Sequence, residues 1–278
     1  MNFTLIETKE DLAFLNQELL QRPIVGIDTE FRRTTRDNMK MSLLQINDSD
    51  EIFIVDAKLI EEPNNSCSFL SSLKVIKVLH SCKEDLEAIY AWSSLEMKNI
   101  YDTQLANAFL GGEFSASYQS LVKENIQIEI DKGETRSNWL RRPLTDSQLH
   151  YAASDVEYLL DIHEHQVYRL KEKKFWHNEE IEVLVNKVFD HNELNETDNI
   201  KLNKENERSF YLELDKRIKD LSDSLEINPT LLLSKKNQKI LIKHIYNSGP
   251  NSALSSLSVW RKRLLEEHIN EIHKELKV

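Results

Sequence analysis

Two acids, Asp28 and Glu30, stand two residues apart at the end of the apolar run Ile24-Val25-Gly26-Ile27. Side chains at positions i and i+2 of a strand point to the same face, so both carboxylates would face the same way. Neighbouring carboxylates repel each other unless a cation lies between them. By itself the pair also fits an exposed strand end, and acids from other segments decide between these interpretations.

Further candidates come from two later segments. Asp85 lies at the start of a predicted helix, and Tyr151 and Asp155 stand four residues apart, which places them on one face of another predicted helix. Carboxylate oxygens suit Mg²⁺ or Mn²⁺, and two such ions about 3.5–4 Å apart can clamp a phosphodiester during in-line displacement. Two divalent metal ions are therefore predicted beside Tyr151, held by Asp28, Glu30, Asp85 and Asp155.

A mixed sheet covered by helices is predicted to position these residues. Strand-like runs cover residues 24–30, 42–46, 52–55, 75–80 and 99–102. Helical spacing predicts helices over 83–92 and 103–110, one long helix from Thr145 to about Leu170, and another over 177–189. Thr145 is a plausible N-cap for the long helix, with Gln148 three residues on. Strands that give way to alternating strands and helices indicate an α/β fold.

A polar stretch over residues 190–199, rich in Asn and acids, shows no periodicity. It predicts a first domain over 1–190, a linker over 191–205 and a small all-α domain over 206–278. Within the last of these, helix breaks are predicted at Asn228-Pro229 and Ser248-Gly249-Pro250.

Composition excludes several classes of protein. Of the 278 residues, 40% are hydrophobic and 30% charged, with five Gly and five Pro, which excludes collagen-like chains and long disordered tracts. No apolar run is long enough to cross a bilayer, the first residues do not resemble a signal peptide, and Cys67 and Cys82 form no disulfide framework. We therefore expect a cytoplasmic protein with no membrane partner and no obligate protein partner.

The net charge of −11 is unevenly distributed. Residues 227–265 contain no acid but carry the basic residues Lys235, Lys236, Lys239, Lys243, Arg261, Lys262 and Arg263. A local basic block keeps its field over a Debye length of about 8 Å, so it can meet phosphates in an otherwise acidic chain. Lys235, Lys236 and Arg261 are therefore candidates for nucleic-acid contacts, and a solvated helix face is the alternative.

The set Asp28-x-Glu30, Asp85 and Tyr151-x-x-x-Asp155 resembles the DEDD exonuclease superfamily, in its tyrosine-containing branch. Neighbouring motifs resemble the ribonuclease D family, namely His80-x-x-x-Glu84-Asp85, Tyr101-Asp102-Thr103-Gln104 and Arg136-Ser137-Asn138-Trp139-x-x-Arg142-Pro143. Residues 206–278 are more weakly similar to a helicase-and-ribonuclease-D C-terminal (HRDC) domain, through Trp260-Arg261. Val259 departs from the Gly of that pattern, and the length leaves room for one such domain where the family has two.

The resemblance implies a ribonuclease-H-like fold and a 3′–5′ exoribonuclease that releases nucleoside 5′-monophosphates. Its implied substrates are tRNA precursors and other small structured RNAs. Asp28 would bridge both metals, with Glu30 and Asp155 completing the first site. Asp85 would hold the second metal, and Tyr151 would orient the attacking water. A DNA exonuclease of repair type and a nucleic-acid-binding protein without catalysis stay open as alternatives.

His150 competes with Tyr151, because the histidine-containing branch of the superfamily has its His five residues before the last Asp. Five residues turn a helix by about 500°, which places His150 some 140° away from Asp155, whereas Tyr151 lies about 40° away. Tyr151 is therefore predicted to act at the site, and His150 is predicted to be a surface or packing residue.

Basic and aromatic residues precede this helix. Trp139 could stack a base, and phosphates could be held by Arg136, Arg141 and Arg142. The alternative is that Trp139 anchors the loop on the core while the arginines are solvated.

Overall fold

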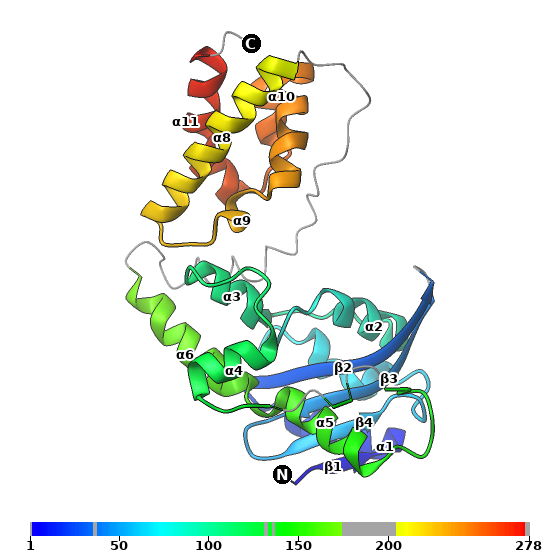
Figure 1. The fold of residues 1–278 in the computed structure, drawn as a ribbon. Coiled ribbons are helices and arrows are strands. Elements are labelled where there is room, and N and C mark those ends of the chain that lie inside the picture. Colours follow the sequence, from blue (N-terminus) through cyan, green and yellow to red (C-terminus); the bar gives the residue numbers. More distant parts are fainter. Residues whose placement is uncertain (1, 36–37, 131–132, 135–136, 174–203, 276–278) are drawn as a thin grey trace. The chain divides into compact units, whose positions relative to one another are not determined.

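The structure is a computed structural model that describes residues 2–35, 38–130, 133–134, 137–173 and 204–275. The chain divides into two compact units (Figure 1), one of Met1–Asn107 with Ser115–Asn186 and one of Ala108–Phe114 with Lys187–Val278. The predicted boundaries at 190, 191–205 and 206 stay a prediction, because residues 174–203 lie outside the described ranges. The helix predicted over 177–189 lies outside them as well.

A mixed six-stranded sheet forms the centre of the first unit, in the order β1-β4-β3-β2-β5-β6. The strands are β1 (Thr4–Ile6), β2 (Ile24–Thr35), β3 (Asn38–Asn47), β4 (Ile52–Asp56), β5 (Ile76–Leu79) and β6 (Ile100–Asp102). Strands β2, β3 and β4 are antiparallel, and the other three join them in parallel. The five predicted strands are confirmed, and β1 is an addition that is too short to show a pattern in the sequence.

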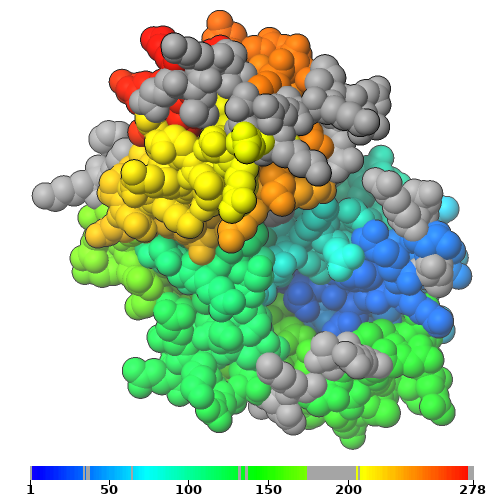
Figure 2. Space-filling model, turned by 45° about the horizontal axis from the view of Figure 1, so that its top comes forward, coloured from blue at the N-terminus to red at the C-terminus, as the bar shows by residue number. Residues whose placement is uncertain are grey.

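Helices cover this sheet. Up to residue 173 they are α1 (Lys9–Leu19), the 3-10 helix η1 (Asn64–Ser71), α2 (Lys83–Ser93), α3 (Thr103–Phe109), α4 (Tyr118–Ile126), α5 (Asp146–Glu157) and α6 (Leu159–Glu172). Helix α5 packs against β2, β3 and β4, while α2 packs against β2 and β3. In the space-filling view of Figure 2, green surface of the segment that contains α5 borders blue surface of the β2–β3 region. The site described below lies where these elements meet.

The long helix predicted from Thr145 is two helices in the structure. Its start is confirmed, because Thr145 and Gln148 form a capping box at the beginning of α5. The prediction that it continues to Leu170 is wrong, since Tyr158 leaves helical geometry (φ −106°, ψ 7°) and separates α5 from α6. The cause is a hydroxyl from Tyr118 on α4, which takes the place of one helical hydrogen bond.

Gly26 allows this helix pair to approach the sheet closely. A Cβ atom at Gly26 would lie 3.2 Å from Cβ of Leu159, the first residue of α6. Gly26 precedes Asp28 by two residues on β2, so the helices meet the strand immediately beside the first candidate acid. A side chain at this position would require Leu159 to shift by a few tenths of an ångström.

The second unit is helical, with α8 (Lys204–Ser224), α9 (Pro229–Leu232), α10 (Lys235–Ser255) and α11 (Val259–Glu275). Both predicted breaks are present, because Asn228 caps α9 and Gly249 interrupts α10 with a φ of 80°. Its core contains Phe210, Leu214, Leu241, Ile245, Leu265 and Ile269. Within the described part of the chain, no helix is both long and apolar enough to cross a membrane.

Candidate active site

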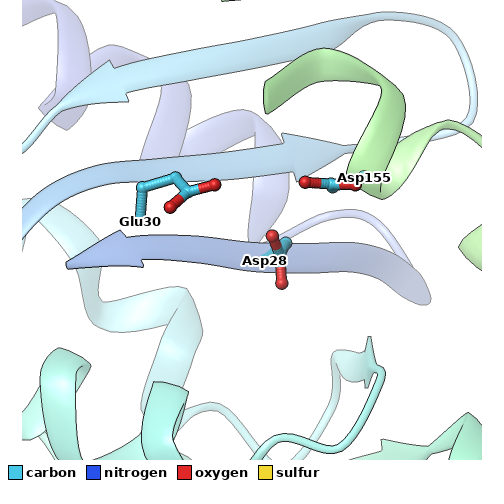
Figure 3. Close-up of side chains that lie close together, drawn as sticks. All are labelled: Asp28, Glu30 and Asp155. Carbon is cyan, nitrogen blue, oxygen red and sulfur yellow. The ribbon is translucent and has the colours of Figure 1, made fainter. Parts of the chain in front are cut away.

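Three carboxylates meet above the central strand of the sheet. Asp28 and Glu30 lie on β2, and Asp155 comes from α5 (Figure 3). Each of them offers one oxygen, and these three oxygens all lie within 4.8 Å of one another. Among the described residues, this is the group of His, Cys, Asp and Glu side chains that is close enough to hold a metal ion.

Among the residues that the structure describes, no ion pair joins these three acids to a basic side chain. Burial and the neighbouring charges of Asp85, Asp155 and Glu30 raise the pKa of Asp28 well above its ordinary value. Burial, Asp155 and Asp85 raise the pKa of Glu30 to about 9. Burial raises the pKa of Asp155 to about 7, although a hydrogen bond from Tyr151 opposes that shift. A divalent cation would neutralise this repulsion, and the hard oxygen donors are those that Mg²⁺ and Mn²⁺ prefer.

Asp85 is the fourth predicted acid, and it is not a member of this three-acid cluster. It lies in the first turn of α2 and is 8% exposed, and its carboxylate accepts a hydrogen bond from Oγ1 of Thr29. Thr29 stands between the two acids of β2, so Asp85 is close enough for its charge to raise the pKa of Asp28. Burial raises the pKa of Asp85 itself to about 7, against the Thr29 hydrogen bond.

Asp102 fixes the turn that precedes α2. Its carboxylate accepts hydrogen bonds from the backbone N–H groups of Ser81 (3.2 Å) and Cys82 (2.9 Å), and Ser81 has a φ of 55°. Asp102 is only 2% exposed, and it ends β6. It thereby determines where α2 begins and where Asp85 stands. Its role is not predictable from the motif Tyr101-Asp102-Thr103-Gln104, which contains it.

Tyr151 lies on the α5 face of Asp155, as its spacing predicts, and donates the hydrogen bond to that carboxylate. His150 is exposed, and its ring packs edge-on against Phe3 with centroids 5.5 Å apart. Tyr151 thus lies toward the acids and His150 on the surface, while a role for Tyr151 at the site stays a prediction.

Gln45 is a site residue that the sequence analysis does not single out. It stands opposite Asp28 in the antiparallel pairing of β2 and β3, so both side chains project from the same face of the sheet. The Gln45 side chain is fully buried, and neither its amide nitrogen nor its amide oxygen has a partner in the described structure. An orphaned buried amide beside an acidic cluster fits a site that holds hydrated ions.

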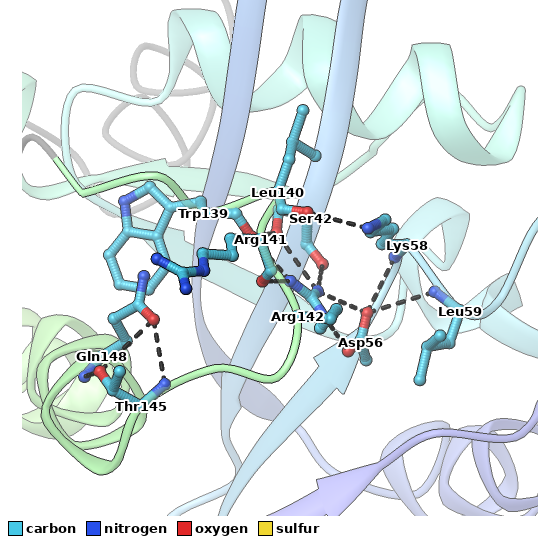
Figure 4. A network of polar contacts seen from close by, with 10 residues as sticks. All are labelled: Ser42, Asp56, Lys58, Leu59, Trp139, Leu140, Arg141, Arg142, Thr145 and Gln148. Carbon is cyan, nitrogen blue, oxygen red and sulfur yellow. Dashed lines mark hydrogen bonds and ion pairs between the residues drawn. The ribbon is translucent and has the colours of Figure 1, made fainter.

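Arg142 does not point to a phosphate, which corrects its prediction as a nucleic-acid contact. Its guanidinium pairs with Asp56 through two bonds of 2.5 and 2.6 Å (Figure 4). The remaining N–H groups donate to backbone oxygens of Trp139, Arg141 and Ser42. Because every N–H group of the guanidinium has an acceptor, Arg142 anchors its loop to β3 and β4.

Trp139 is likewise unavailable for stacking on a base. The side chain is 5% exposed, and its ring lies 6.0 Å from that of Tyr151, centroid to centroid. The alternative that Trp139 anchors the loop on the core describes its position. In the same loop Arg141 is exposed and stays a candidate, whereas Arg136 lies outside the described residues.

The candidates in the second unit also divide. Arg261 donates to the carbonyl of Leu231 (2.9 Å) and stacks on Trp260, and burial lowers its pKa to about 10. Its prediction as a nucleic-acid contact is therefore corrected to a packing role. Lys235 and Lys236 are exposed in the first turn of α10, and their contact with nucleic acid stays a prediction.

The mixed sheet and its three-acid cluster define the class of enzymes that use divalent ions on phosphate esters. A family model for 3′–5′ exonuclease domains matches residues 3–170. That is more than half of the chain, so the chain belongs to the 3′–5′ exonuclease family.

Curated relatives point to the same family. The chain is 37% identical over 169 residues to ribonuclease D of Pseudomonas paraeruginosa, a match that covers 61% of this chain and 45% of that one. The chain therefore spans less than half the length of this relative.

Solved structures share the fold. The crystal structure of Escherichia coli RNase D, described as an exoribonuclease involved in structured RNA processing, matches 100% of this chain and 76% of its own, with a TM-score of 0.62 and 23% identity. Brucella melitensis NrnC with bound Mg²⁺ matches 67% of this chain and 89% of its own, with a TM-score of 0.56 and 19% identity.

Proposed function

We propose that the chain is a metal-dependent 3′–5′ exoribonuclease that hydrolyses phosphodiester bonds and releases nucleoside 5′-monophosphates. The observation that carries this proposal is the cluster of Asp28, Glu30 and Asp155, whose oxygens lie within 4.8 Å of one another. The identity with ribonuclease D supports RNA as the substrate, and 3′ ends of tRNA precursors and other small structured RNAs are the substrates we propose.

The acids divide into two groups by their positions. Glu30 and Asp155 would hold one divalent ion together with Asp28, and Asp85 with Asp28 would hold a second. When bound, two such ions, Mg²⁺ or Mn²⁺, supply an activated water and stabilise the leaving 3′ oxygen. The Mg²⁺ bound to NrnC, which shares this fold, supports Mg²⁺ as one of the candidates.

Tyr151 orients the attacking water in this proposal. Its hydroxyl bonds to Asp155, which places a phenol oxygen at the edge of the acid cluster. An ordinary phenol has a pKa of about 10, so it is a poor base at neutral pH. Trp139 packs against the Tyr151 ring and keeps it in place.

The second unit is proposed to be an HRDC-like domain that binds RNA. The four helices described between residues 204 and 275 are consistent with such a domain. Along α10, the exposed lysines are Lys235, Lys236, Lys239 and Lys243. We place the protein in the cytoplasm, where the buried free thiols of Cys67 and Cys82 would stay reduced.

The test uses a 5′-labelled tRNA with a 3′ extension and a matched single-stranded DNA. The purified chain is incubated with each in Mg²⁺, Mn²⁺ or EDTA, beside Asp28→Asn and the control Asp161→Asn, which changes an exposed acid of α6. We expect stepwise 3′ shortening of the RNA that stops in EDTA, falls more than about a hundredfold in Asp28→Asn and persists in Asp161→Asn.

Other outcomes separate the alternatives. Preferential shortening of the DNA would replace the proposal with a repair-type exonuclease. RNA binding without cleavage, unaffected by EDTA, would instead leave a nucleic-acid-binding protein without catalysis.

A further inference from the structure

At the junction between α5 and α6, a tyrosine hydroxyl replaces one backbone hydrogen bond of the helix. In a regular helix the N–H of Tyr158 would donate to the carbonyl of Ser154, four residues earlier. Instead the Tyr118 hydroxyl lies between these two groups. It accepts from the N–H of Tyr158 (3.0 Å) and donates to the carbonyl of Ser154 (3.2 Å).

This insertion flanks Asp155 directly. Ser154 is the residue before Asp155. The two residues after Asp155 are Val156 and Glu157, and the carbonyls of both accept a hydrogen bond from Nδ2 of Asn47 at 3.0 Å. The backbone on both sides of the acid is therefore bound by side chains that come from β3 and α4. A regular helix through Tyr158 would change the angle between α5, which carries Asp155, and α6, although both helices pack against β2.

Tyr118 is itself held firmly. It is 7% exposed and lies in the first turn of α4, whose N-cap is Ser117. Its ring lies 5.9 Å from that of His80, and His80 is bonded in turn to Oγ1 of Thr103 and to the carbonyl of Ala116. The hydroxyl consequently has little freedom to leave the gap.

We propose that Tyr118 is a positioning residue for the metal site, because its hydroxyl opens the helix between Ser154 and Tyr158 and so sets where Asp155 meets Asp28 and Glu30. This inference rests on the proposed function, since it assumes that the three acids hold a divalent ion. It adds a residue whose contacts are with the backbone of α5 rather than with the ion.

The test compares two tyrosine-to-phenylalanine variants of the full chain. Tyr118→Phe removes the inserted hydroxyl and keeps the ring. Tyr101→Phe is the matched control, because Tyr101 is also buried and its hydroxyl donates to the side chain of Gln166 on α6 (3.3 Å) rather than to the backbone of α5. Mn²⁺ affinity is measured by calorimetry without RNA, and cleavage is measured over a range of Mn²⁺ concentrations.

We expect Tyr118→Phe to bind Mn²⁺ about tenfold more weakly, which is the scale of one or two lost hydrogen bonds. Its cleavage rate should fall at limiting Mn²⁺ and recover at saturating Mn²⁺, while the KM for RNA stays unchanged. Tyr101→Phe should match the wild type in both measurements. Melting temperatures of the two variants show that each is folded.

Three results would overturn the inference. Mn²⁺ affinity equal to the wild type in Tyr118→Phe would mean that the hydroxyl only completes packing. Equal losses in both variants would show a general effect of removing a buried hydroxyl. A wild type that neither binds Mn²⁺ nor cleaves RNA would remove the proposed function, and this inference with it.

Discussion

At the scale of single residues, the acids of the site are destabilising to the metal-free chain. Burial raises the pKa values of Asp28, Glu30 and Asp155, and the charges of neighbouring acids raise those of Asp28 and Glu30 further, so the charged forms are disfavoured in the fold. An unfolded chain would let each acid ionise at its ordinary pKa of about 4. The fold therefore retains protons that the unfolded chain releases.

The sign of this linkage gives a prediction. The stability contributed by the protonated acids is complete below pH 4 and is lost as pH rises through the folded pKa values, about 7 for Asp155 and about 9 for Glu30. In EDTA we expect the melting temperature to fall between pH 5 and 9, with Asp155 accounting for about 2–4 kcal/mol. The fall is measured by thermal melts of the wild type in EDTA, compared with the wild type in Mg²⁺ and with Asp155→Asn in EDTA.

A control is built into the comparison. Burial lowers the pKa of Lys77 to about 7, which makes stability rise above that pH, in the opposite direction. Lys77 is present in both proteins, so its effect cancels in the difference between wild type and Asp155→Asn. A fall of equal size in both proteins would contradict the prediction.

Within each segment, local spacing predicts which candidate residues lie on one face, whereas the meeting of Asp28 with Asp155 rests on the resemblance to a family. Alternation on a strand places Asp28 with Glu30, and helical phase places Tyr151 with Asp155 and removes His150. The role of Arg142 is not predictable, because its partner Asp56 lies 86 residues earlier. Gln45 carries no local signal either, since only strand pairing brings it opposite Asp28.

At the scale of elements, the loop before α5 is attached to an irregularity of the sheet. The pairing of β2 with β3 shifts register between Glu30 and Phe31, next to Ser42. Ser42 donates through Oγ to the carbonyl of Trp139 at 2.5 Å, and its own carbonyl accepts from Arg142. The loop that contains Trp139, which packs against Tyr151, is thus hydrogen-bonded to the strand at this register shift.

We predict that Asp56 and Arg142 act as a unit in folding. Arg142→Gln should cost about 3–5 kcal/mol of unfolding free energy, because it leaves the buried carboxylate of Asp56 without its partner. Asp56→Asn should cost less, because the side chain of Arg142 is 18% exposed. The double variant should cost much less than the sum. Urea denaturation of the three variants measures this coupling, and filter binding should show unchanged RNA affinity in folded Arg142→Gln.

Phosphate contact by Arg142 would give a different pattern. RNA affinity would then fall in Arg142→Gln with little loss of stability, and the two substitutions would be additive. Arg141→Ala, which removes the exposed neighbour, is the matched variant for a phosphate contact.

Element boundaries differ in how far the sequence predicts them. The beginning of α5 is encoded locally by Thr145 and Gln148, and that prediction is confirmed. The end of α5 depends on Tyr118, 40 residues before Tyr158, so periodicity alone continues the helix to Leu170. Irregularities imposed by tertiary contacts lie beyond sequence patterns.

At the scale of the whole molecule, charge is divided between parts of the chain. The net charge is −11, yet residues 227–265 carry basic residues and no acid. In the structure Arg261 of that basic block bonds to the backbone of Leu231, whereas the lysines of α10 are exposed. The polar break near residue 190 and the helical second part follow from composition, whereas the exact boundaries fall outside the described residues.

We predict that Lys235→Ala/Lys236→Ala weakens RNA binding and lowers its dependence on salt. Each lost phosphate contact should reduce the slope of log affinity against log salt by about 0.7–0.9, giving a change of about 1–2 for the pair. Titrations of the full chain at several salt concentrations measure the slope. The control is Arg208→Ala/Lys216→Ala, which removes two exposed charges from α8. Equal changes of the slope in the two double variants would refute specific RNA binding by the first turn of α10.

The missing side chain at Gly26 has a consequence for the choice of ion. Because α6 contacts the strand at 3.2 Å from where a Cβ would be, backbone and a single Leu159 side chain fix the separation between strand and helix. A larger residue at position 26 would push Leu159 away from the strand that carries Asp28. Mg²⁺ prefers oxygens at about 2.0–2.1 Å and Ca²⁺ at about 2.3–2.6 Å. A wider separation between the strand and the helices would therefore favour the larger ion, although both ions carry the same charge.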